Sequence, residues 1–143
     1  MYLTIREVSQ NDAAAISLLS IQLGYSISTE KTEQQIIAVN TSPNDIACVA
    51  VDEEKVIGWI HIFYMLRLEC ASYCEIGGLV VDEKYRGKGI GKMLINQAIP
   101  WCKEKRCGKL KVRSNIKRTE AHKFYEQAGF NEMKQQKVFE IYL

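Results

Sequence analysis

Hydrophobic positions along the chain follow two spacings, one typical of strands and the other of helices. Alternating or short unbroken apolar runs, bounded by turn residues, predict strands over 3–8, 46–51, 56–64, 73–81 and 109–113. Apolar residues three and four apart predict helices over 13–23, 29–40, 89–105 and 119–128. The tail, 130–143, has the pattern of two more strands. This order predicts an α/β protein with a mixed sheet, antiparallel at its start, and helices on both faces.

Turn and capping residues support several of these boundaries. Gly24 and Gly129 follow predicted helices, and Ser28 is placed to cap the second one. Pro100 falls inside the third helix, where it removes a backbone hydrogen bond, so we expect a kink or an early break there. The pair 77–78 is Gly-Gly within a predicted strand, which indicates either a β-bulge or a close approach of another part of the backbone.

Composition indicates one globular domain over residues 1–143, with 47% hydrophobic and 25% charged residues. A net charge of +2 gives no case for nucleic acid or membrane partners. The first residues lack the apolar run of a signal peptide, and no stretch approaches the length of a membrane span, so we expect a cytoplasmic protein. The five cysteines lack C-x-x-C spacing, which predicts free thiols and no metal site.

The loop that follows the strand 73–81 is the most informative segment. It carries three alternating glycines, Gly87, Gly89 and Gly91, and a helix begins directly after them. Glycines leave backbone N–H groups open to a ligand, and a helix N-terminus adds unpaired donors and a positive dipole end. Because cations flank the glycines, the loop is predicted to bind a pyrophosphate.

Other glycine motifs fit this loop poorly. A phosphate-binding Walker loop needs four residues between its first Gly and a Gly-Lys pair, and a Ser or Thr after that pair. Here only three residues separate Gly87 from Gly91-Lys92, and Met93 stands in place of the hydroxyl residue. A dinucleotide fingerprint has the form G-x-G-x-x-G near the start of a βαβ unit, whereas this loop reads G-x-G-x-G behind a hairpin. A glycine-rich turn that only caps a helix stays open as an alternative.

Two segments together resemble the signatures of the GNAT N-acetyltransferase superfamily. R-G-K-G-I-G at 86–91 matches its R/Q-x-x-G-x-G/A motif, and residues 115–130 are similar to its second motif, N…A-x-x-F-Y-x-x-x-G-F. The resemblance covers essentially the whole chain. It implies the acyl-CoA N-acyltransferase fold, a mostly antiparallel seven-stranded sheet flanked by four helices, with one parallel strand pair splayed apart to admit coenzyme A.

The resemblance also assigns residues to acetyl-CoA, the expected co-substrate. It implies that the strand backbone at Leu79, Val80 and Val81 pairs with the pantetheine arm and that Asn115 holds a pantetheine amide. The diphosphate would be bound by Arg86, Gly87, Lys88, Gly89, Ile90, Gly91 and Lys92. Tyr125 matches the position whose phenol protonates the departing thiolate.

Acetyl transfer to an amine also needs a group that removes a proton, because alkylamines are protonated at neutral pH. Glu75, on the strand that leads into the loop, is the candidate base, with a solvent-facing carboxylate as the alternative reading. His61 shares a strand face with Trp59 and Phe63; a hydrogen-bonded sheet histidine is favoured there over a residue lining an acceptor pocket. No Cys–His pair suggests a covalent route, so direct attack is expected.

The predicted function is therefore acetyl-CoA-dependent N-acetylation of a primary amine on a small molecule. The motifs are similar to those of members that acetylate aminoalkylphosphonates or aminoglycosides. Two alternatives remain: acetylation of a protein or peptide, and a non-catalytic acyl-CoA-binding regulatory module. The resemblance also allows a homodimer formed through the late strands.

Overall fold

The computed structural model describes residues 1–143, which form five strands and four α-helices. In chain order these are β1 (Leu3–Glu7), α1 (Ala13–Ser20), α2 (Thr29–Thr41), β2 (Asp45–Asp52), β3 (Lys55–Met65), β4 (Tyr73–Val81), α3 (Ile90–Glu104), β5 (Leu110–Val112) and α4 (Thr119–Gln127). Three short 3-10 helices are η1 (Gln10–Asp12), η2 (Ile21–Leu23) and η3 (Glu83–Tyr85). The chain divides into two compact units, residues 1–113 and 114–143.

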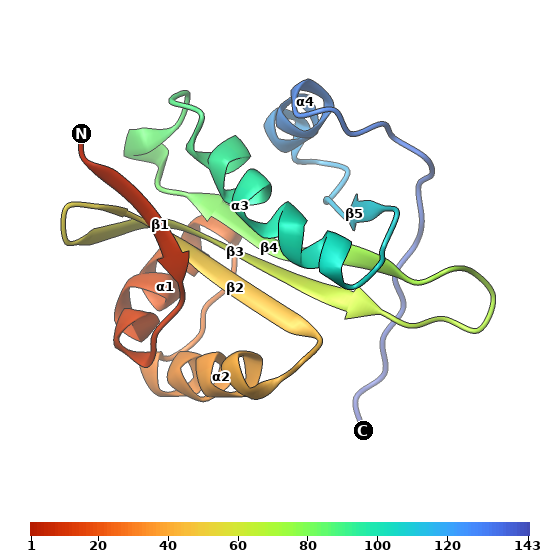
Figure 1. The fold of residues 1–143 in the computed structure, drawn as a ribbon, viewed down its shortest axis with the longest axis horizontal. Helices are drawn as coiled ribbons and strands as arrows, with labels where there is room; N and C mark the ends of the chain where they lie inside the picture. Colours follow the sequence, from red (N-terminus) through yellow and green to blue (C-terminus); the bar gives the residue numbers. More distant parts are fainter. The chain divides into compact units, whose positions relative to one another are not determined.

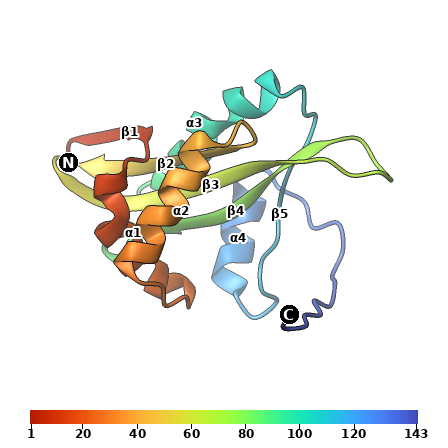
Figure 2. The ribbon, with the colours of Figure 1, turned by 90° about the horizontal axis from the view of Figure 1, so that it is seen from below.

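The first unit is a sheet covered by helices on both faces. Its strands follow the order β1-β2-β3-β4-β5; the first three pairings are antiparallel and only β4 with β5 is parallel (Figure 1). Helices α1 and α2 cover one face and α3 the other (Figure 2). These features confirm the predicted mixed, mostly antiparallel sheet and the four helices.

The expected count of seven strands is wrong. The predicted strands in the tail do not form: residues 130–143 contain neither helix nor strand, and Val138, Phe139 and Ile141 are each more than 80% exposed. An alternating pattern shows only that a segment could cover one face of a sheet. A strand also needs a neighbouring strand for its backbone groups, and no local pattern supplies that partner.

The parallel pairing of β4 with β5 is short. It joins residues Cys74–Ile76 of β4 to Leu110–Val112, where β5 ends, while β4 continues to Val81. The N–H of Asp82, which directly follows β4, donates to Ile57 O of β3 at 2.8 Å. Because N–H groups alternate sides along a strand, those of Leu79 and Val81 point away from β3, toward the edge that has no strand partner.

The glycine pair in β4 forms the expected bulge. His61 pairs with Gly78 but the next residue, Ile62, pairs with Ile76, so Gly77 is an extra residue with no partner of its own. Such a bulge bends the strand and changes the direction of the backbone groups beyond it.

Aromatic side chains of β3 lie directly over these two glycines. A Cβ at Gly78 would lie 2.5 Å from Trp59 Cη2, and one at Gly77 would lie 2.7 Å from Phe63 Cε1 and 3.1 Å from His61 Nδ1. No larger residue fits at either position without moving a ring. The aromatic side chains of β3 therefore occupy the space that side chains at the two glycines of the bulge would need.

The other face of the sheet packs against α3. Its Leu94 is fully buried and would touch a Cβ added at Gly58 of β3. The helix continues through Pro100 to Glu104, so the expected early break does not occur. Pro100 lies near the helix end and only its own N–H is lost, which the packing of the buried face offsets.

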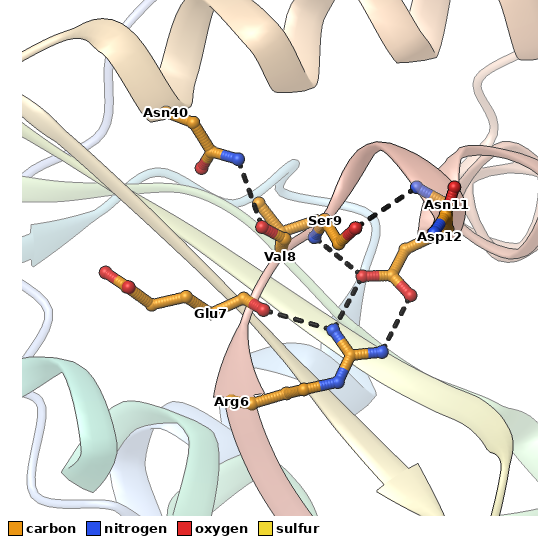
Figure 3. Close-up of polar contacts among 7 residues, drawn as sticks. All are labelled: Arg6, Glu7, Val8, Ser9, Asn11, Asp12 and Asn40. Atoms are coloured by element: carbon orange, nitrogen blue, oxygen red, sulfur yellow. Dashed lines mark hydrogen bonds and ion pairs between the residues drawn. The ribbon is translucent and has the colours of Figure 1, made fainter.

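A polar network fixes the start of α1 relative to β1 (Figure 3). Arg6 donates to both carboxylate oxygens of Asp12, at 2.8 and 2.9 Å, and the Ser9 N–H donates to the same carboxylate at 2.8 Å. Asn40 of α2 donates to Val8 O at 3.0 Å. Burial raises the pKa of Asp12, but the hydrogen bonds from Arg6 and Ser9 and the charge of Arg6 outweigh it and hold this pKa below its ordinary value.

Replacing Asp12 by Asn should destabilise the protein by about 1–2 kcal/mol at neutral pH, because a capping acceptor and an ion pair are lost. A carboxylate with a depressed folded-state pKa stabilises the fold above its unfolded pKa, about 3.9, and this contribution disappears as the pH falls through the folded value. Denaturant unfolding of wild type and D12N should therefore differ at pH 7 and converge below pH ~4. The exposed E54Q is the control; a difference that does not vary with pH would contradict this role.

Candidate functional site

The glycine loop adopts a conformation that leaves backbone donors open. Gly87 and Gly89 have φ of 78° and 80°, in the left-handed region that favours glycine, and a Cβ at either would meet no atom within 4 Å. Gly89 is the N-cap of α3 and no side chain caps this helix. The N–H groups of the first turn of a 15-residue helix are thus free of side-chain partners, which is the arrangement that binds anions.

Arg86 supports the loop through its own hydrogen bonds. Its Nε donates to Val81 O at 3.0 Å, and its Nη2 donates to Gln22 Oε1 at 3.3 Å. The same Gln22 oxygen accepts from the Glu83 N–H at 3.0 Å. Gln22 in η2 therefore ties the segment after α1 to the loop. Sequence reasoning missed this residue, because a contact across more than 60 positions leaves no local pattern.

Two lysines lie close to the ring of Tyr85 at the start of the loop. Lys88 Nζ is 5.5 Å from the ring centroid and Lys55 Nζ is 5.7 Å from it. Lys88 and Lys92 are exposed, while Ile90, the first residue of α3, is buried. The loop thus combines open backbone donors with exposed positive charge, a combination that favours binding of an anion.

Glu75 lies on β4, four residues before Leu79, and is 8% exposed. It pairs with Phe63 across the sheet, so the two side chains share a face. Arg113 Nε donates to both of its carboxylate oxygens, at 3.2 and 3.3 Å. The predicted base is thus a mostly buried carboxylate held by an arginine, not a solvent-facing one.

His61 is hydrogen-bonded, as the sequence favoured. Its Nε2 lies 2.7 Å from Asp45 Oδ1, and Ser42 Oγ donates to Asp45 Oδ2 at 2.6 Å. Sequence reasoning did not identify Asp45 or Ser42 as partners, because their approach to His61 depends on the pairing of β2 with β3.

The second unit contains Asn115 and Tyr125. Asn115 Oδ1 accepts from the Lys117 N–H at 2.9 Å, and its backbone oxygen lies 2.9 Å from His122 Nε2. Tyr125 in α4 packs against Phe130, with ring centroids 5.5 Å apart. Burial raises the pKa of Tyr125 and the charge of Arg118 lowers it; the net pKa is raised, so the phenol is protonated at neutral pH.

A half-open cavity of about 200 Å³ lies beside the start of β2, and none of its lining residues belongs to the glycine loop. It is lined by Glu7, Val8, Val39, Asn40, Asp45, Ile46 and Ala47. The histidine, cysteine and acidic side chains form no cluster of three or more arranged to hold a metal ion. None of the helices is long and apolar enough to cross a membrane.

Comparison with known proteins identifies the family. The model of the acetyltransferase (GNAT) family matches residues 12–130. This match covers most of the chain, and the protein belongs to the GNAT family. The resemblance of the two sequence motifs is thereby confirmed.

Two curated relatives match part of the chain. N-alpha-acetyltransferase 30 of Saccharomyces cerevisiae is 35% identical over 68 residues, which is 48% of this chain and 38% of that protein. The aminoalkylphosphonate N-acetyltransferase of Salmonella typhimurium is 31% identical over 91 residues, which is 63% of this chain and 59% of that protein. The matches span less than two thirds of the length of either relative.

Solved structures share the fold over nearly the whole chain. An aminoglycoside 6'-N-acetyltransferase of Acinetobacter baumannii has a TM-score of 0.86 at 17% identity, covering 99% of both chains. An aminoglycoside N-acetyltransferase in complex with CoA has a TM-score of 0.87 at 17% identity, covering 98% of this chain and 95% of that one. At such low identity the likeness establishes the fold alone.

Replacing Gln22 by Met, which has a similar length but no amide oxygen, should release the Glu83 N–H. Its hydrogen exchange should become about tenfold faster or more, since a lost hydrogen bond of this kind is worth about 1 kcal/mol or somewhat more. Amide exchange followed by NMR measures this directly. The exposed Q34M on α2 is the matched control, and unchanged exchange at Glu83 in Q22M would show that Gln22 does not hold the loop.

Proposed function

We propose that this protein is an acetyl-CoA-dependent N-acetyltransferase that moves an acetyl group to a primary amine of a small molecule. The observation that carries the proposal is a pair of open backbone segments close together in the chain. The edge of β4 over residues 77–81 has no strand partner, and after the hydrogen-bonded turn 82–86 the glycine loop opens into the uncapped N-terminus of α3. Membership in the GNAT family supports the same reading.

The residues present fit the coenzyme. Open space at Gly87 and Gly89 leaves room for a diphosphate against the backbone, and Lys88 and Lys92 supply positive charge. The N–H groups of Leu79 and Val81, on the free edge of β4, are donors for the amides of the pantetheine arm and for the thioester oxygen. Val80 is part of this strand, Ile90 and Gly91 form the first turn of α3, and Arg86 holds the loop in shape.

The roles expected of Asn115 and Tyr125 form part of this proposal. Asn115 would hold a pantetheine amide, and Tyr125 would give its proton to the departing sulfur. The Tyr125 phenol carries its proton at neutral pH, as a group that donates a proton must. The amine must lose a proton before direct attack, and Glu75 on β4 is the base expected from the sequence. A cytoplasmic location and a homodimer stay predictions.

A small-molecule acceptor is supported by the Salmonella relative, whose match covers more of this chain than that of the yeast relative. The yeast relative favours a second candidate, acetylation of a protein N-terminus. A panel of aminoalkyl compounds and of peptides with free N-termini, read out by release of free thiol, separates the two. Turnover confined to peptides would reject the small-molecule acceptor, and coenzyme binding without turnover of any amine would favour a non-catalytic module.

Acetyl-CoA should raise the melting temperature, because it binds only the folded protein; at 100 times Kd the gain is about 2.7 kcal/mol. Replacing Gly89 by Asp should abolish this shift, since the new side chain would place a carboxylate where the phosphates are expected. Thermal melts with and without acetyl-CoA measure the effect. G108D, the same substitution at an uncrowded site outside the loop, should keep the full shift. A folded G89D with a wild-type shift would refute the loop assignment.

Replacing Tyr125 by Phe removes the phenolic proton and keeps the ring that packs against Phe130. The turnover number should fall by about 100-fold, within the usual range for a general acid, while the Kd for acetyl-CoA stays within a factor of about three. Steady-state kinetics and a binding titration supply the two numbers. Turnover at the wild-type rate would remove Tyr125 from the chemistry.

A further inference from the structure

A chain of three side chains runs from the end of α2 to the middle of β3. Ser42 Oγ donates to one oxygen of Asp45, and His61 Nε2 lies 2.7 Å from the other. A carboxylate only accepts hydrogen bonds, so Nε2 carries the proton in this pair. Neutral imidazole holds one proton, and Asp45 therefore leaves Nδ1 of His61 as a free acceptor.

The free nitrogen faces the bulge of β4. His61 Nδ1 is 3.1 Å from the position that a Cβ of Gly77 would occupy, and it makes no hydrogen bond. The bulge is followed directly by Leu79, whose N–H points to the open edge of the strand. The unprotonated nitrogen is thus aimed at the part of β4 where the reacting group is proposed to lie.

His61 lies on the face of the sheet that α1 and α2 cover. Trp59, two residues earlier and on the same face, packs against the core formed with these helices. The His61 side chain is nevertheless 28% exposed, whereas that of Glu75 is 10% exposed. His61 therefore offers an acceptor molecule better access than Glu75 does.

Glu75 is also already engaged with a partner. Arg113 Nε donates to both of its oxygens, so the carboxylate is turned toward the arginine. His61 instead has the Asp45 carboxylate at Nε2, on the opposite side of its ring, which fixes the ring and leaves Nδ1 turned away from that carboxylate. This is the arrangement of a base oriented by a third group.

We propose that His61 is the general base of the acetyl transfer, with Asp45 as its positioning residue and Ser42 holding Asp45. This inference rests on the proposed function and replaces Glu75 in the role of base. Nδ1 removes one proton from the acceptor ammonium, and the free amine nitrogen then bonds to the acetyl carbon as the carbon–sulfur bond breaks. Tyr125 gives its proton to the departing sulfur, and the second proton released by the nitrogen restores the Tyr125 phenol. The products are an amide, a thiol and one proton, which His61 returns to solvent.

The charged groups that face His61 are few. Asp45 approaches from β2 and Glu75, with its partner Arg113, from β4. α1 carries no charged side chain, and the buried residues of α2 are Thr32 and Ile36. Besides His61 itself, Glu75 is therefore the candidate base to compare. The pH dependence of turnover should be measured in a variant that lacks His61 and in one that lacks Glu75.

The kinetic test uses H61Q, whose amide can still donate to Asp45 and keep the tie between β2 and β3. Its turnover number should fall about 100-fold, with the Kd for acetyl-CoA unchanged and the acidic limb of the pH–rate profile lost. D45N should lower turnover about tenfold, and D52N, the same change at the other end of β2, should have no effect. Turnover of H61Q within about twofold of wild type, or loss of the acidic limb in E75Q instead, would overturn the proposal.

A second readout does not depend on turnover. Ring nitrogen NMR of the full-length protein should show Nε2–H and an unprotonated Nδ1 at His61, and D45N should shift the balance of tautomers. Protonation on Nδ1 in the neutral ring would overturn the proposal even if no acceptor were known. Failure of acetyl-CoA to bind or to react with any amine would instead count against the proposed function, so the two failures are distinguishable.

Discussion

The arrangement of the candidate site depends on the early end of the pairing between β4 and β5. β5 stops at Val112, so the last five residues of β4 have a strand neighbour on one side only. Unpaired N–H groups are costly to bury and ready to bind, which makes this edge a natural site for a ligand with amide carbonyls. The bulge at Gly77 lies where the paired and unpaired parts of β4 meet, and the glycine loop begins where β4 ends.

The rest of the first unit holds this edge in place. On one side of the sheet, α3 packs through Leu94 and starts at the glycine loop, which fixes the direction of its N-terminus. On the other side, Trp59 and Phe63 cover the glycines of the bulge. Gln22 then joins the loop to the segment after α1.

Local patterns in the sequence were enough for much of this. The order and type of elements in the first unit, the bulge at Gly77 and the glycine loop all follow from residue spacing and turn chemistry. The tail was predicted wrongly because alternation in residues 130–143 says nothing about a pairing partner. Pro100 was expected to kink α3 or to break it early; the helix is not broken, and it continues to Glu104.

The features that sequence reasoning missed are contacts between distant segments. Gln22 reaches Arg86 across 64 positions, and Asp45 reaches His61 because the register of β2 with β3 brings them to the same face. Such pairs depend on register, which no single segment encodes. They also change the chemical reading, since the partner of Glu75 is an arginine and that of His61 is a carboxylate.

The central claim is that the open edge of β4 and the backbone of the glycine loop bind the coenzyme. A titration with acetyl-CoA followed by amide NMR tests it most directly. The account predicts that the N–H signals of Leu79, Val81 and residues 87–92 shift together, with one common Kd. Shifts confined to other residues, such as those lining the cavity beside the start of β2, or no shifts at saturating coenzyme, would contradict it.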